Sequence, residues 1–266
     1  MRNRTLVCPL RSGSSGNAVL IAADSTRILV DSGVACRTIE QAMLSIGEDA
    51  ASLDALLVTH EHADHIASVG AMMRRYKLPL YVNEPTWLAM RSGLGNIDED
   101  LVHLIREDKA FTIGSMSVTS FATPHDAVSP VGYRVESGHG AVTLLTDIGE
   151  MDEHLLQQAS GSRVVLIEAN YDPVMLMAGP YPAQLKQRVS SSVGHLSNQD
   201  CAHAVGSLLE TGTEQFVLSH LSKENNYPEL ALLTVGRYLN SLAAHPGRDA
   251  RISVARRFAV SDPLCL

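Results

Sequence analysis

One stretch, residues 55–65, constrains this chain more than any other part of it. It begins with an apolar run over 55–58, which has the length and bulk of a buried strand. The next seven positions read Thr-His-Glu-His-Ala-Asp-His, with three imidazoles and two carboxylates in close succession. Histidine is the commonest metal ligand in proteins, and carboxylate oxygens suit divalent cations. The stretch therefore predicts a metal site at a strand end, with a surface cluster of acids and histidines as the alternative.

The spacing of these residues excludes a helical zinc motif. That motif needs two histidines one helical turn apart, but the position one turn after His60 holds Asp64. We therefore predict a loop leaving a strand, with His60 and His62 pointing one way and Asp64 and His65 another. Such an arrangement suits two adjacent metals. Asp64 is also expected to cap a helix that runs on through Met73.

Composition narrows the class of protein. The length of 266 residues fits one large domain or two small ones, with ample material for a core. No apolar run is long enough to span a membrane, and the N-terminus lacks the apolar segment of a signal peptide. The four cysteines are far apart and are expected to be reduced thiols of a cytoplasmic protein, although a disulfide stays open. A net charge of −8 argues against a protein that coats polyanions, but not against a nuclease.

Three further residues that could bind a metal stand at the ends of predicted strands. His125 follows an alternating strand pattern and a proline, and Asp147 and His220 each follow an apolar run. Taken alone, each has a simpler interpretation, such as a core or surface histidine or an aspartate that caps a helix. Asp31 also follows an apolar strand pattern, and we expect it to hold the metal loop from behind, because histidine ligands usually donate their other N–H to a carboxylate.

The order of these residues resembles the metallo-β-lactamase superfamily. The segment 59–65 matches its Thr-His-x-His-x-Asp-His signature, and the later residues appear in the expected order. The resemblance implies a first metal bound by His60, His62 and His125. It implies a second metal bound by Asp64, His65 and His220, with Asp147 bridging the two and with room for a shared water or hydroxide.

The same resemblance predicts the architecture. Alternating strand and helix patterns alone favour only an α/β or α+β protein. The superfamily implies the α/β (α+β) class, with a four-layer αββα sandwich of two sheets of four to six strands each. A single hydrolase domain over residues 1–266 is expected.

A second motif points to the substrate. Gly-His-Leu-Ser at 194–197 resembles a motif of ribonuclease Z and related phosphodiesterases, in which the histidine acts at the phosphate. His195 is therefore a candidate catalytic residue, together with Asp64, which would orient the nucleophile while it binds metal. Asp147 stands where many true β-lactamases use cysteine, which disfavours lactam hydrolysis. The alternative for His195 is a loop histidine that caps the next helix. Asn198 is also expected to cap that helix, which should run from about Gln199 to Glu210.

Four segments together, 12–17, 168–172, 181–188 and 194–198, are similar to the YycJ (also WalJ) group, whose members are regarded as 5′ exonucleases on DNA. The resemblance implies a metal-dependent phosphodiesterase that acts on DNA in preference to RNA. It implies that the scissile phosphate is flanked by Lys186, Arg188, Ser197 and Asn198.

Several points stay open at this level. Nitrogen and oxygen ligands fit zinc or manganese, with iron as a third choice. A thioester or lactam hydrolase of the same fold is the alternative function, and a protein that uses its metals only structurally is a third. No membrane partner is expected, and the oligomeric state is open, a homodimer included.

Overall fold

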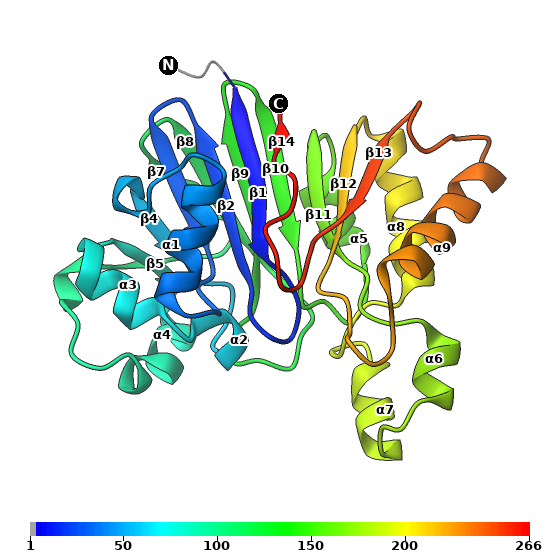
Figure 1. Cartoon of the computed structure of the whole chain (residues 1–266), viewed down its shortest axis with the longest axis horizontal. Helices are drawn as coiled ribbons and strands as arrows, with labels where there is room; N and C mark the ends of the chain where they lie inside the picture. Colours follow the sequence, from blue (N-terminus) through cyan, green and yellow to red (C-terminus); the bar gives the residue numbers. More distant parts are fainter. Residues whose placement is uncertain (1–3) are drawn as a thin grey trace. The chain divides into compact units, whose positions relative to one another are not determined.

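The computed structural model describes residues 4–266, which fall into two compact units (Figure 1). Of the described residues, unit 1 comprises 4–122, 127–140 and 256–266, and unit 2 comprises 123–126 and 141–255. Each unit therefore gathers segments from separate parts of the sequence. The single domain expected over residues 1–266 stays a prediction, and residues 1–3 lie outside the described part.

The strands belong to two mixed sheets, and the first lies wholly in unit 1. Its strands are, in spatial order, β14 (Leu264–Cys265), β1 (Thr5–Arg11), β2 (Ala18–Ala23), β3 (Thr26–Val30), β4 (Ala55–Leu57), β5 (Leu80–Asn83) and β6 (Val102–Ile105). Pairing is antiparallel from β14 to β3 and parallel from β3 to β6. The sheet has more than the expected four to six strands, because its edge strands β14 and β6 are short and partly exposed and carry little apolar signal.

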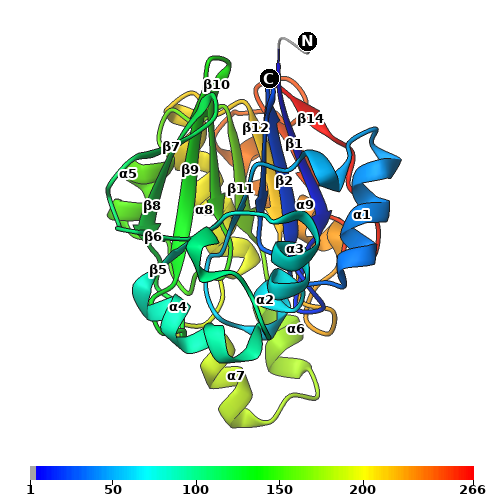
Figure 2. The same ribbon diagram turned by 90° about the vertical axis from the view of Figure 1, so that its left-hand side faces the viewer.

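Helices cover this sheet within unit 1. They are α1 (Cys36–Ser45), α2 (Ala63–Ile66), α3 (Val69–Tyr76) and α4 (Glu84–Met90). Figures 1 and 2 show α1 and α3 alongside the strands of the first sheet. Met43 of α1 and Met72 of α3 share one buried core with Leu20, Leu29 and Leu56 of the strands. This apolar layer fixes β3 and β4, the two strands that lead into the predicted metal loop.

Unit 1 also contains an antiparallel ribbon of three strands, β7 (Phe111–Ile113), β8 (Met116–Ala122) and β9 (Val131–Ser137). β9 supports the predicted metal loop, because the Val131 amide donates to the Thr59 carbonyl at 3.0 Å. The Tyr133 hydroxyl, which is fully buried, donates to the Val58 carbonyl at 2.7 Å. The backbone just before His60 is therefore held from two sides.

Unit 2 is built on four parallel strands, in the order β10 (Gly140–Leu145), β11 (Val164–Glu168), β12 (Gln215–Ser219) and β13 (Arg251–Val254). Its helices are α5 (Glu153–Ala159), α6 (Pro173–Ala178), α7 (Ala183–Val189), α8 (Asn198–Glu210) and α9 (Pro228–Ser241). Because the strands are parallel, their carboxyl ends meet at one edge, and the segments after β10, β11 and β12 carry Asp147, His195 and His220, respectively. His125 reaches unit 2 by a different route, in the short segment 123–126 that follows β8.

Two helix starts differ from the sequence prediction. Asp64 lies inside α2 and does not cap a longer helix, and the chain breaks between α2 and α3. Asn198 is the first residue of α8, and the preceding Ser197 caps the helix by accepting from the Asp200 amide at 3.1 Å. Among residues 4–266, no helix combines the length and the apolar character needed to cross a membrane.

Candidate metal centre

Unit 1 carries the first cluster, which we define as His60, His62, Asp64 and His65, in the loop and helix that follow β4. The ring centroid of His60 lies 4.5 Å from that of His62 and 4.1 Å from that of His65. Asp64 Oδ2 lies 3.6 Å from His65 Nε2. His60 and His65 are almost fully buried. The fold of this unit thus brings together the four residues of the predicted motif.

Asp31 supports the first cluster through hydrogen bonds to Thr59 and His65, as expected from the sequence. Its buried carboxylate accepts from His65 Nδ1 at 2.7 Å and from the Thr59 amide and hydroxyl at 2.9 Å each. Because Nδ1 of His65 is occupied in this way, Nε2 is the nitrogen left to face a ligand. The residue supplies both a fixed ring orientation and a negative charge that raises the basicity of the imidazole.

The break between α2 and α3 comes from hydrogen bonds to other parts of unit 1. The Asp64 carbonyl accepts from the Asn17 amide at 2.8 Å, and the His65 carbonyl accepts from the Ser32 amide at 2.8 Å. The Ser68 amide donates to the Ser32 carbonyl at 2.8 Å. In a continuous helix these groups would pair with one another, so these contacts override the local helical pattern. The backbone at position 33 packs so closely against the backbone of Asp64 that only glycine fits there. A Cβ at Gly33 would lie 1.6 Å from the Asp64 carbonyl oxygen.

Asn17 is a site residue that sequence reasoning missed. Its side-chain Nδ2 lies 3.0 Å from His65 Nε2 and 3.3 Å from Asp64 Oδ2, and its Oδ1 accepts from the Gly13 amide at 2.7 Å. It therefore joins the turn between β1 and β2 to the first cluster. The asparagine at the end of the Ser-Gly-Ser-Ser-Gly-Asn turn was the available signal, but it reads equally well as an ordinary turn residue.

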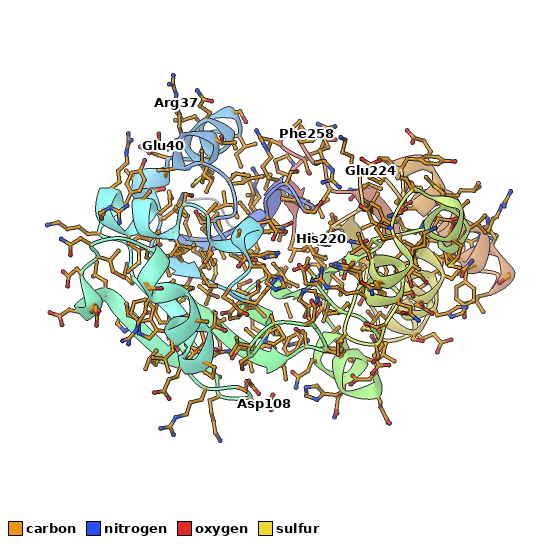
Figure 3. The ribbon with its side chains drawn as sticks, turned by 90° about the horizontal axis from the view of Figure 1, so that it is seen from below. Arg37, Glu40, Asp108, His220, Glu224 and Phe258 are labelled. Carbon is orange, nitrogen blue, oxygen red and sulfur yellow. The ribbon has the colours of Figure 1, made fainter. Side chains whose placement is uncertain are left out.

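Unit 2 carries the second cluster, which we define as His125, Asp147, His195 and His220. Asp147 Oδ1 lies 3.8 Å from His125 Nε2 and 3.5 Å from His220 Nδ1. His125, Asp147 and His220 are all buried. His220 is labelled in Figure 3, as is the exposed Glu224 four residues later. The three ligands predicted far apart in this part of the sequence are thus close together in unit 2.

Glu168, at the end of β11, organises the second cluster. Its fully buried carboxylate accepts from His195 Nδ1 at 2.8 Å and from His220 Nδ1 at 3.0 Å through Oε1, and from the Ile148 amide at 2.8 Å through Oε2. The Asn170 amide donates to the same carboxylate at 3.1 Å and to the His220 carbonyl at 2.8 Å. In the sequence, Glu168 closes an apolar strand pattern and Asp172 follows four residues later, so a supporting role could be assigned to either carboxylate. The contacts of Glu168 give it the same role in unit 2 that Asp31 has in unit 1.

In the second cluster, the Glu168 carboxylate and the His195 imidazole each favour the charged form of the other. Burial alone would lower the pKa of His195, but the Glu168 carboxylate outweighs it, and the pKa of His195 is raised. Burial likewise opposes the charged form of Glu168, yet His195 and His220 hold the pKa of that carboxyl below its usual value. The pKa of His125 is lowered, mainly by burial. The surroundings thus favour the protonated form of His195 more than that of an ordinary histidine, and the protonated form of His125 less.

Three site residues have backbone conformations that their side chains rarely adopt. Asp31, Asp147 and His220 have φ angles of 61°, 56° and 53°, in the left-handed region. Each follows directly, or within two residues, the end of a strand. Such conformations cost roughly 1–3 kcal/mol each and persist where the surrounding structure enforces them. They turn three strand ends so that the side chains join their clusters.

The sequence left open that Asp147 and His195 serve only as helix caps, and the structure assigns both caps to other residues. Asp152, not Asp147, caps α5 by accepting from the Leu155 amide at 2.8 Å. Ser197 caps α8, so His195 does not. His195 instead bonds to Glu168 and keeps about a fifth of its side chain exposed.

The residues predicted to flank a phosphate have other contacts. Arg188 forms a two-pronged ion pair with Asp126, and Lys186 donates to the Met177 carbonyl at 2.7 Å. The Ser197 hydroxyl donates to Asp200 at 2.6 Å. Asn198 is fully buried and exchanges amide hydrogen bonds with Asn226. These contacts give Ser197 and Asn198 structural roles, and contact of the four residues with a substrate stays a prediction.

The part of the sequence that carries both clusters matches a known protein family. A family profile described as a beta-lactamase superfamily domain matches residues 26–221, which include every predicted metal ligand. The chain belongs to the metallo-β-lactamase superfamily. This membership confirms the resemblance noted in the sequence.

Individual relatives narrow the relationship within the superfamily. The chain is 39% identical to the exodeoxyribonuclease WalJ of Streptococcus pneumoniae over 91% of both chains. It is 37% identical to the exodeoxyribonuclease YycJ of Bacillus anthracis over 86% of this chain and 87% of that one. The protein is thus a metallo-hydrolase and a homologue of the WalJ and YycJ exodeoxyribonucleases.

A solved structure supports the fold. The metallo-β-lactamase fold protein YhfI of Bacillus subtilis aligns with a TM-score of 0.71 over 97% of this chain and 99% of that chain, at 17% identity. The predicted metallo-β-lactamase fold is confirmed, with two mixed sheets flanked by helices.

Proposed function

We propose that this protein is a dinuclear-metal-dependent phosphodiesterase that degrades DNA from the 5′ end. The observation that carries the proposal is the 39% identity to the exodeoxyribonuclease WalJ over nearly the whole of both chains. The two buried clusters of imidazoles and carboxylates support it, because each is backed by a buried acid that orients its histidines.

The donor set fits two divalent cations. It consists of imidazole nitrogens and carboxylate oxygens without thiolate, which suits zinc or manganese, with iron as a further choice. The Nδ1 atoms of His65 and His220 are engaged by Asp31 and Glu168, which leaves Nε2 of each ring for a metal. His65 would exchange its bond to Asn17 for the metal.

The seven ligands divide between two metals in our proposal. His60, His62 and His125 would hold one, and Asp64, His65 and His220 the other. Asp147 would bridge them. When bound, two divalent ions supply an activated water at neutral pH and offset the charge of a phosphoryl group. Asp64 would in addition orient the attacking water.

His195 would act on the phosphate itself. Its Nδ1 is held by Glu168, so Nε2 can donate a hydrogen bond to a phosphoryl oxygen or a proton to the leaving oxygen. The raised pKa favours the protonated ring that both roles need. Removal of such a group typically slows a reaction by about 10²–10⁴-fold.

The substrate is proposed to be DNA rather than RNA, with Lys186, Arg188, Ser197 and Asn198 beside the scissile phosphate. Arg188 would reach the phosphate only by loosening its ion pair with Asp126. The Arg188 side chain is about half exposed. The four cysteines are free thiols, in keeping with a proposed cytoplasmic location.

Digestion of end-labelled nucleic acids tests the proposal. Single- and double-stranded DNA and RNA, labelled at either end, are incubated with the metal-loaded protein, and released products are followed over time. We expect mononucleotides or short products from the 5′ end of DNA, loss of activity with a chelator, and recovery with zinc or manganese. Release from the 3′ end first would refute the polarity, and faster digestion of RNA would refute the substrate.

A matched variant tests the role of His195. His195→Ala should keep its full metal content and lose most cleavage of bis-p-nitrophenyl phosphate and of DNA. Unchanged cleavage would remove His195 from the mechanism. Parallel assays with nitrocefin and a thioester cover the alternative chemistry, and turnover of either at a higher rate than the phosphodiester would overturn the proposal.

A further inference from the structure

The exposed turn between β1 and β2 is firmly attached to the first cluster. Asn17 joins the two, because its backbone amide donates to the Asp64 carbonyl and its Oδ1 accepts from the Gly13 amide. Gly16, with φ of 133°, donates its amide to the Gly13 carbonyl at 2.8 Å. Ser14 and Ser15 form the exposed tip of this turn. Ser14 stands three positions before Asn17, so the tip lies within about 10 Å of Asn17 at the limit of an extended chain.

An arginine from the far end of the sequence lies on this tip. Arg257 Nη1 lies 3.2 Å from the Ser14 hydroxyl and 3.4 Å from the Ser15 hydroxyl. Its guanidinium carbon lies 3.0 Å from the position that a Cβ would take at Gly13. A larger residue at position 13, where φ is 120°, would therefore push the guanidinium away. The contact draws the segment after β13 into unit 1 beside the turn.

The next residue is an exposed aromatic ring. Phe258 is 69% exposed, whereas Phe121 and Phe216 are fully buried. The Arg257 guanidinium carbon lies 5.9 Å from the centre of the Phe258 ring. Figure 3 shows Phe258 at the margin of the view. We call Ser14, Ser15, Arg257 and Phe258 the arginine–phenylalanine patch.

The chemistry of the patch fits single-stranded nucleic acid. A guanidinium and two hydroxyls are donors for phosphate oxygens, and an exposed ring next to them offers a stacking surface for a base. Only an unstacked base can lie on such a ring, which favours a single strand over a duplex. The patch is positive at its centre in a chain of net charge −8, so it provides a local attraction that the whole molecule lacks.

We propose that the arginine–phenylalanine patch binds the single-stranded DNA substrate next to the cleaved nucleotide, with a phosphate on Arg257 and the turn serines and a base stacked on Phe258. This inference rests on the proposed function and adds to it a binding surface that includes none of the proposed metal ligands. The neighbouring Arg256 is paired with Asp262 at 3.1 Å and is assigned no part in it.

The test compares a long substrate with a short one. Phe258→Ala and Arg257→Ala are assayed on a single-stranded oligonucleotide and on bis-p-nitrophenyl phosphate, which is too small to reach the patch. Loss of one stacked base should raise KM for the oligonucleotide about 10-fold, within the range measured for base–aromatic stacking. Turnover of the small phosphodiester should stay within about twofold of the unsubstituted protein.

Further variants separate stacking from packing. Phe258→Trp should preserve or tighten oligonucleotide binding, whereas Phe258→Leu, which keeps apolar bulk without a ring, should resemble Phe258→Ala. Arg37→Ala and Leu44→Ala, at exposed positions of α1, serve as controls and should change neither substrate. Figure 3 shows Arg37 at the margin of the view, on that helix.

The outcomes distinguish the two proposals. If the unsubstituted protein hydrolyses neither DNA nor the small phosphodiester, the proposed function fails. If it digests DNA and the Phe258 and Arg257 variants match it, only the patch proposal fails. Equal losses on both substrates, or full rescue by Phe258→Leu, would assign these residues a structural role and overturn the patch as well.

Discussion

The two clusters of site residues use the same chemistry but are assembled in opposite ways. In unit 1, four residues within a single loop and short helix supply the cluster, and Asp31 orients one imidazole. In unit 2, the residues come from the ends of separate segments, and Glu168 orients two imidazoles at once. The first cluster depends on local spacing, and the second depends on the parallel strands that bring distant segments to one edge.

This difference predicts how each cluster responds to substitution of its supporting carboxylate. A change at Asp31 removes support from a loop whose ligands stay neighbours in sequence. Of the proposed ligands that Asp31 contacts, only His65 is affected, although Thr59 also loses its acceptor. A change at Glu168 releases His220, a proposed ligand, and His195, a proposed catalytic group. The second cluster should therefore be the more fragile of the two, in both stability and catalysis.

Glu168→Ala should give the largest effect. It leaves the buried His220 imidazole, the partly exposed His195 imidazole and the Ile148 amide without their shared acceptor. Breaking a buried pair typically costs about 3–5 kcal/mol of unfolding free energy. Loss of phosphodiesterase activity by about 10²-fold or more is expected, and added metal should not restore it. Denaturant unfolding and kinetics at saturating zinc or manganese measure both. Glu168→Gln, which keeps the shape, is the control and should unfold with a smaller loss. Near-normal activity of Glu168→Ala would show that the second cluster does not depend on this carboxylate.

Asp31→Asn should give a smaller effect of a different kind. Partners of metal-bound histidines typically contribute about 10–100-fold in metal affinity. Activity should fall at limiting metal and recover at saturating metal, because His195 keeps its own partner. A metal titration of activity, run beside the Glu168 variants, measures the contrast. If excess metal rescued both Asp31→Asn and Glu168→Ala, the proposed difference between the clusters would be lost.

Thr59→Val tests the support of the first loop alone. The Thr59 hydroxyl donates to Asp31, and one such hydrogen bond contributes about 0.5–1.5 kcal/mol to stability. Thr59→Ser keeps the hydroxyl and is the matched control. Chemical denaturation of both variants gives the difference, and a loss as large as that of Glu168→Ala would contradict the ranking of the two clusters.

Arg188→Ala should have the smallest effect on stability. Its ion pair with Asp126 is largely exposed, and such pairs contribute about 0.2–1 kcal/mol. The pair lies next to His125, whose Nδ1 bonds to the Gly194 carbonyl at 3.0 Å, so that hydrogen bond should keep the imidazole in place. Thermal unfolding measures the stability change. A loss of several kcal/mol would mean that the ion pair, and not the backbone contact, holds this part of unit 2.

The sequence predicted the first cluster more fully than the second. The motif from Thr59 to His65 carries its own spacing, and the support from Asp31 follows from the general habit of histidine ligands. His125, Asp147 and His220 were found by their order along the chain, but each had a simpler interpretation when taken alone. Only the fold of unit 2 shows that they lie together.

The errors of the sequence reasoning have one physical cause. The helix expected from Asp64 through Met73 is interrupted because backbone groups of 64–68 bond to Asn17 and Ser32, which are distant in sequence. Asn198 was expected to cap a helix, but the neighbouring Ser197 does so, and Asn198 pairs with Asn226 in the core. Local patterns describe what a segment favours, and tertiary hydrogen bonds decided both cases.

Other features had no sequence signal. The left-handed conformations of Asp31, Asp147 and His220 occur at residues that adopt them uncommonly, and only the surrounding contacts enforce them. The sharing of one Glu168 oxygen by two imidazoles likewise depends on β11 and β12 lying side by side in register.

Metal content of single-ligand variants tests the central claim most directly. Purified protein, His65→Ala and His220→Ala are each reconstituted with zinc or manganese, dialysed, and measured for metal per chain beside hydrolysis of a phosphodiester. We predict two ions per chain in the unsubstituted protein, fewer in each variant, and loss of hydrolysis in both. Full metal content in either variant, or hydrolysis that survives without metal, would contradict the assignment of the two clusters to one dinuclear centre.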